Sequence, residues 1–71
     1  MENYPKAIEK YEKEIKILET NEYLDKDKNN TRIVYNNIAK LYEKLGNDKK
    51  SKEYYEKANE IEEYMKDILE E

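Results

Sequence analysis

The chain has no cysteine and no histidine, and only one serine and two threonines. The absence of cysteine excludes disulfides, thiol chemistry and thiolate metal ligands. The absence of histidine removes the usual base of a nucleophilic catalyst. Carboxylates such as Glu60, Glu63 and Asp67 are abundant, but a carboxyl group needs a dry pocket before its pKa rises into the catalytic range. We therefore expect a protein that is not an enzyme and that uses no cofactor.

Long apolar runs are missing as well, since none approaches the roughly 20 residues that span a bilayer. The first residues also lack the basic and then apolar layout of a signal peptide. Residues 25–30 begin like a calcium loop, but Asn30 replaces the turn glycine and Asn36 replaces the bidentate glutamate. We expect a cytoplasmic protein with no membrane partner and no metal.

Charge of both signs is plentiful, because 14 Lys and Arg stand against 18 Asp and Glu for a net charge of −4. Net acidity argues against nucleic acid as the partner. With 71 residues and no Phe or Trp, the chain forms one domain, residues 1–71, and its eight tyrosines must supply much of the packing. Tyr55 is expected in the core, whereas Tyr64 suits either the core or an exposed patch.

Three amphipathic patterns predict helices over residues 4–20, 31–45 and 48–69. In the first, Asn3 is a suitable N-cap and Pro5 is tolerated in the opening turn. Thr31 is the expected N-cap of the second. The apolar residues recur at spacings of three and four, at Tyr4, Ile8, Tyr11, Ile15 and Leu18, then Val34, Ile38, Leu41, Tyr42 and Leu45, then Tyr54, Ala58, Ile61, Met65 and Ile68.

The only glycine joins the second and third patterns. Gly46 tolerates the left-handed conformation that ends many helices, and Asn47 or Asp48 can cap the next one. A helical hairpin preceded by one extra helix is therefore predicted, an all-α three-helix bundle. Small Ala39 and Ala58 are expected where its helices approach closely. The third helix is the longest, so its last turns, with Tyr64, Met65, Ile68 and Leu69, need a partner such as Tyr23 and Leu24 or a second copy of the chain.

The hairpin closely resembles a tetratricopeptide repeat (TPR). The residues at that family's spacing are Tyr35, Ile38, Ala39, Tyr42, Gly46, Ser51, Tyr55 and Ala58. Residues 3–13 are echoed by 47–57, which indicates one and a half repeats. The offset of 44 residues exceeds the family's usual period of about 34. The lengthened connection and the run Asn-Asn-Ile-Ala resemble those of kinesin light chains.

The resemblance implies a protein-binding scaffold rather than a catalyst. In that family the first helix of each repeat lines a concave groove, and the positions that match it here are Ile33, Asn36, Asn37, Lys40 and Glu43. Asn37 is the best single candidate to hold a peptide backbone. The implied partner is a peptide or helix of another protein, or a second copy that docks on Tyr64, Met65, Ile68 and Leu69.

Two alternatives remain open. The first is a structural unit without a ligand, either an engineered protein or a fragment of a repeat array. The second is a resemblance to the microtubule-interacting and trafficking domain, whose last helix has a pattern that Tyr54, Ala58, Ile61, Tyr64 and Met65 echo. The Gly46 turn favours the repeat.

Overall fold

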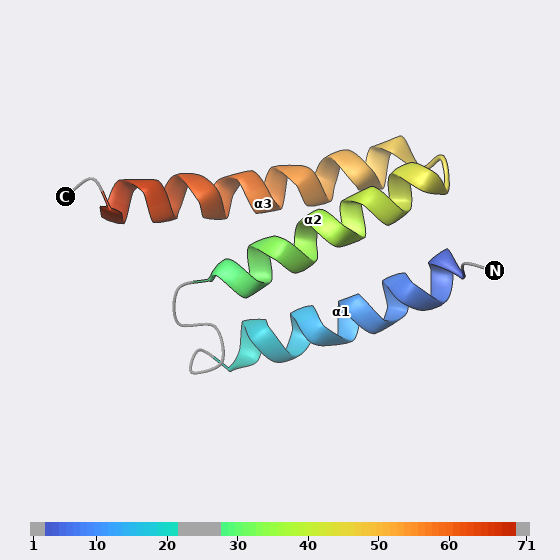
Figure 1. Ribbon diagram of the computed structural model, residues 1–71, viewed down its shortest axis with the longest axis horizontal. Coiled ribbons are helices and arrows are strands. Elements are labelled where there is room, and N and C mark those ends of the chain that lie inside the picture. The colour runs from blue at the N-terminus through green and yellow to red at the C-terminus, as the bar shows by residue number, and fades with distance from the viewer. Residues whose placement is uncertain (1–2, 22–27, 70–71) are drawn as a thin grey trace.

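The computed structural model describes residues 3–21 and 28–69, with side chains up to residue 67. Helix α1 spans Tyr4–Thr20, α2 spans Asn29–Lys44 and α3 spans Asp48–Leu69. Helix α2 lies between the other two, with α3 antiparallel to it (Figure 1). Within the described residues both outer helices pack on α2 rather than on each other, and no strand is present. The all-α prediction is confirmed.

Two asparagines cap α1 and α3 in the same way. The Asn3 Oδ1 accepts a hydrogen bond from the Lys6 N–H at 3.1 Å, and the Asn47 Oδ1 accepts one from the Lys50 N–H at 3.2 Å. Gly46 between α2 and α3 has φ +80°, the left-handed geometry predicted for it. These local signals therefore set three of the helix ends as the sequence predicts.

The start of α2 differs from its prediction. The helix begins at Asn29, two residues before the expected cap Thr31, which is itself buried within it. Lys28 precedes the helix in the left-handed conformation, and its carbonyl accepts the Arg32 N–H at 3.1 Å. The reason is that Thr31 falls on the same helix face as Tyr35 and Ile38, so it faces the core instead of the open end of the helix.

The core is centred on α2. It unites Ile15 of α1, Val34, Tyr35 and Ile38 of α2 and Ala58 of α3. Ile38 has no exposed surface, which contributes about 1.5–3 kcal/mol of burial free energy. Ala39 and Ala58 are both buried, in agreement with their expected place at close helix contacts.

Helix α3 is longer than its neighbour. Its 22 residues extend about 33 Å against about 24 Å for the 16 residues of α2. The C-terminal turns of α3 therefore run past the start of α2 (Figure 1). Tyr23 and Leu24, expected to cover these turns, lie outside the described residues.

Candidate functional site: grooves on both sides of the central helix

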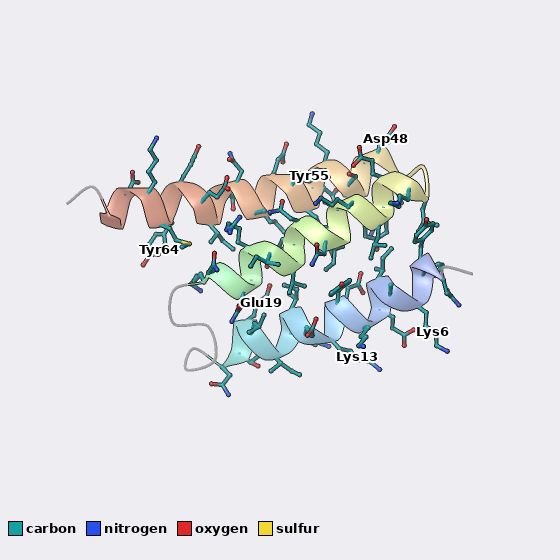
Figure 2. The ribbon with its side chains drawn as sticks, in the orientation of Figure 1. Lys6, Lys13, Glu19, Asp48, Tyr55 and Tyr64 are labelled. Atoms are coloured by element: carbon teal, nitrogen blue, oxygen red, sulfur yellow. The ribbon has the colours of Figure 1, made fainter. Side chains whose placement is uncertain are left out.

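An open groove runs between α2 and α3. Its volume is about 630 Å³. Helix α2 contributes Asn36 and Glu43, and α3 contributes Asp48, Ser51, Lys52, Tyr55, Glu56, Ala58, Asn59 and Glu62. Four of these ten side chains are carboxylates and one is an ammonium group, so the lining is acidic. Figure 2 shows Asp48 and Tyr55 on the N-terminal half of α3.

Two small residues lie deepest in this α2–α3 groove. Ser51 is 5% exposed and Ala58 is 3% exposed, and they are two turns apart on α3. No hydrogen bond among the described residues involves the Ser51 hydroxyl, although its backbone N–H donates to the Asn47 carbonyl at 3.0 Å. A buried hydroxyl without a partner keeps its full capacity to donate and accept.

Tyr55 closes one side of the groove. It is half-buried at the edge, not in the core where it was expected. Its hydroxyl donates to Oε2 of Glu43 at 3.1 Å and so ties α3 to α2. Burial and the adjacent Glu43 carboxylate raise the pKa of Tyr55 above its ordinary value, so the phenol remains a neutral donor further into the alkaline range.

A charged pair lies at the other end of the groove. The Arg32 Nη1 is 3.5 Å from Oε1 of Glu62, joining α2 to α3. The Arg32 Nη2 also donates to Oδ1 of Asn29 at 2.9 Å. Glu62 is therefore partly neutralised. Asp48 and Glu56 make no ion pair within the described part of the chain.

The five positions implied by the family resemblance divide between two grooves. Asn36 and Glu43 line the α2–α3 groove, whereas Ile33 lines a smaller α1–α2 groove of about 340 Å³. Half-buried Asn37 and exposed Lys40 line neither of these two grooves. The described grooves therefore do not gather the five positions in one lining.

The α1–α2 groove is the more apolar of the two. Its side chains are Glu14, Ile17, Leu18, Asn30, Ile33 and Val34. Ile17 and Ile33 are 54% and 42% exposed, which is high for isoleucine. These two side chains form an apolar patch, of which the sequence analysis names only Ile33.

A third groove lies between α1 and α3, with Tyr35 and Ile38 of α2 in its lining, and lysine side chains cover it. The Lys57 ammonium lies 5.7 Å from the ring centre of Tyr35 and 5.8 Å from that of Tyr54, and Lys50 lies 5.8 Å from that of Tyr42. These cation–π contacts place lysine stems over the apolar floor. In contrast, Lys6 projects from α1 away from α2 (Figure 2).

The predicted self-association face is only partly described. Tyr64 is 56% exposed on the section of α3 beyond α2, which decides between its two expected environments in favour of the surface (Figure 2). Met65 is half-buried, and the side chains of Ile68 and Leu69 lie outside the described residues.

Most of the α3 wall was missed from the sequence. The sequence analysis names no candidate among Lys52, Glu56, Asn59 and Glu62, because charged and polar side chains on a helix usually form a solvated face. The signal that points to them is the echo of α1 in α3, which aligns this wall with the face of α1 that packs on α2.

The described residues contain no group of three or more potential metal-ligating side chains. Nor is any helix among residues 3–21 and 28–69 both long and apolar enough to cross a membrane.

The chain folds as the single helix α1 followed by the α2–α3 hairpin, and α3 repeats the N-cap and the register of α1. This is the architecture of a helical-repeat protein. The profile of the tetratricopeptide repeat family matches residues 1–63. The chain therefore belongs to the tetratricopeptide repeat family, and it holds about one and a half repeats. No curated protein and no solved structure gave a match.

Proposed function

We propose that the chain is a non-catalytic scaffold that binds a short segment of another protein in the α2–α3 groove. Repeats of this family are typically protein-interaction modules. The observation that supports this site is a groove of about 630 Å³ whose deepest polar group, the Ser51 hydroxyl, has no partner within the described residues. Asn36 and Asn59 add amide groups that suit a peptide backbone.

Affinity is expected to be modest. A single repeat supplies one groove, whereas proteins of this architecture build extended binding surfaces from several repeats. Ordering a flexible peptide also costs free energy that a small interface offsets only in part. We expect a Kd of about 10 μM to 1 mM, in the range where binding free energies are roughly −7 to −4 kcal/mol.

Selection of peptides on the immobilised chain tests this proposal. Random peptides are displayed and enriched, and calorimetry then measures the Kd of the enriched peptides. Replacing Asn36 and Tyr55 together with Ala should weaken binding about tenfold or more, a loss of about 1.4 kcal/mol. The matched control replaces Asn30 and Tyr64, which are the same residue types outside the α2–α3 groove, and should retain the affinity.

Either of two results would contradict the proposal. The first is that no peptide is enriched over an unfolded, proline-substituted chain, which is the outcome for a structural unit without a ligand. The second is equal affinity for the parent and the Asn36/Tyr55 variant. An Asn37→Ala variant shows in addition whether Asn37 takes part.

Self-association is the second candidate, favoured by the exposure of Tyr64 beyond the end of α2. A copy that docks there would cover an apolar surface that α2 is too short to reach. Light scattering over a concentration series measures the mass. A dimer that dissociates when Met65 and Ile68 are replaced with Lys supports this candidate, and a monomer at about millimolar concentration excludes a dimer whose Kd lies well below that concentration.

A further inference from the structure

The α3 wall of the groove has an equivalent on α1. The two helices share their cap geometry, with Asn3 and Asn47 each bonded to the N–H three residues on. This fixes the offset at 44 residues in the structure as well as in the sequence. Each residue of α3 can then be compared with the α1 residue at the same place on its helix.

The equivalent faces of the two helices differ in character, since that of α1 is apolar and that of α3 is polar. Helix α1 packs on α2 with four residues, Ile8, Tyr11, Ile15 and Leu18, of which both isoleucines are buried. The equivalent positions of α3 are Lys52, Tyr55, Asn59 and Glu62, and all four line the α2–α3 groove. Only the tyrosine is retained.

A second apolar helix therefore does not suit this groove. A helix packed there as α2 packs on α1 would bury the Glu62 carboxylate and the Lys52 ammonium, and removing such charges from water costs several kcal/mol unless each is paired. A hydrophilic occupant avoids that cost. The lining of the α2–α3 groove therefore suits a hydrophilic ligand better than a further apolar helix.

Charge selects among hydrophilic occupants. Glu43, Asp48, Glu56 and Glu62 line the groove against Lys52 alone. Glu62 is paired with Arg32 and Glu43 accepts the Tyr55 hydroxyl, which leaves Asp48 and Glu56 as carboxylates without an ion pair in the described part of the chain. A cationic segment complements this pattern.

We propose that the α2–α3 groove binds a lysine-bearing segment of a partner protein, with ammonium groups against Asp48 and Glu56 and a polar contact to the Ser51 hydroxyl. This inference rests on the proposed function and adds the chemistry of its ligand. The Ser51 hydroxyl is 5% exposed and lines the groove without a partner among the described residues, so it is a directional contact that diffuse charge attraction does not supply.

The test uses a fluorescein-labelled peptide of alternating lysine and alanine as the probe, with a glutamate–alanine peptide of equal length for comparison. Fluorescence anisotropy at low salt measures both Kd values. The lysine probe should bind about tenfold or more tightly than the glutamate probe, and the difference should shrink at about 0.5 M salt, where the screening length falls to a few ångströms.

Charge variants locate the binding. Replacing Asp48 and Glu56 with Lys should weaken the lysine probe about fivefold or more, whereas Lys52→Glu should strengthen it by a few fold. The matched control replaces Glu63 and Asp67 with Lys. This pair has the same effect on net charge, lies on α3 and is exposed, but lies outside the groove.

Ser51→Ala provides the second readout. Alanine removes the hydroxyl and leaves the volume nearly unchanged, so the denaturation midpoint should hold while the affinity for the lysine probe falls about fivefold. Equal affinity of the two charge variants would overturn the inference, since net charge alone would then explain binding. Unchanged affinity in Ser51→Ala would also overturn it.

The two proposals fail in different ways. Enrichment of neutral or acidic peptides that depend on Asn36 and Tyr55 keeps the proposed function and overturns the inference about lysine. Enrichment of an apolar helical peptide has the same effect. Failure of every peptide, whatever its charge, to bind overturns both.

Discussion

The Tyr35 hydroxyl on α2 donates a hydrogen bond to the Glu19 carboxylate on α1, across 16 residues of sequence. About two helical turns further along α2, the Tyr42 hydroxyl donates to Oε1 of Glu12 on α1 at 3.2 Å. The Tyr55 hydroxyl on α3 donates in the same way to Glu43 on α2. The rings of Tyr35 and Tyr42 also pack against that of Tyr54 on α3. Three tyrosine–glutamate bonds thus join the helices that form the grooves.

Removal of the Tyr35 hydroxyl should destabilise the fold modestly. The Tyr35→Phe variant keeps the buried ring and loses one bond to a charged acceptor, so the free energy of unfolding should fall by about 1–2 kcal/mol. Urea denaturation followed by circular dichroism measures this change. Tyr42→Phe is the matched control and should lose less, because Tyr42 is more exposed. A larger loss in the control would contradict this ranking.

Alkaline pH should weaken the fold through the same tyrosines. Burial, reinforced by Glu19, raises the pKa of Tyr35 far above 10.0, and burial also raises the pKa of Tyr54 and Tyr42. Above about pH 10 the unfolded chain releases phenol protons that the folded chain retains. The unfolded state then binds fewer protons, so the free energy of unfolding falls as pH rises, while the tyrosine contribution is complete below pH 10.

Denaturation midpoints at pH 8, 9 and about 10.5 test this dependence. The parent should lose stability over the last interval, and Tyr35→Phe should show a smaller loss there because one shifted group has been removed. Parallel profiles for the two proteins would show that Tyr35 does not carry the effect and that other groups, such as the lysines, do.

Enlarging Ala58 should overpack the contact between α2 and α3. The side chain is 3% exposed and touches the core cluster, so Ala58→Leu should lower the free energy of unfolding by about 1–3 kcal/mol. Asn59→Leu is the matched control, because it introduces the same leucine side chain at the next position, which is exposed. It should change the free energy of unfolding by about 0.5 kcal/mol or less. Equal midpoints for the two variants would mean that the α2–α3 register is wrong.

Gly46 offers a test of chirality. Its φ of +80° strains any L-residue, although a methyl group there meets no atom within 4 Å. Gly46→Ala should therefore cost about 1–2 kcal/mol. A synthetic chain with D-alanine at this position adopts the same φ without strain and should gain about 0.4–1 kcal/mol, because its unfolded state has less freedom. Destabilisation by both enantiomers would contradict the assigned turn.

The sequence predicts the helices well, because each is marked by local signals. Asn3, Gly46 and Asn47 act on neighbours three or four residues away, and the apolar spacing fixes which face is inward. Thr31 gave a wrong prediction because a local signal was the only one available. Threonine is a good N-cap by residue type, and only its packing on the same face as Tyr35 shows that it lies inside the helix. The free energy of an N-cap is smaller than that of burying a whole helix face.

The groove is harder to predict than the helices. The family resemblance implies that the α2 residues Asn36 and Glu43 line a groove, but it does not say which neighbour stands beside them. The α3 wall is defined by the groove in the structure, where Asn59 and Glu62 stand on the opposite side from these α2 residues. The tyrosine–glutamate bonds have no sequence signal, since their partners are 12 to 30 residues apart.

The most direct test of a peptide-binding α2–α3 groove is an amide chemical-shift titration of the ¹⁵N-labelled chain with an enriched peptide. We predict that the largest shifts fall on both walls of the groove, at Asn36, Glu43, Ser51, Tyr55 and Asn59, and saturate at one peptide per chain. Shifts confined to Ile17 and Ile33, or to the section of α3 around Tyr64, would contradict this account and place binding elsewhere.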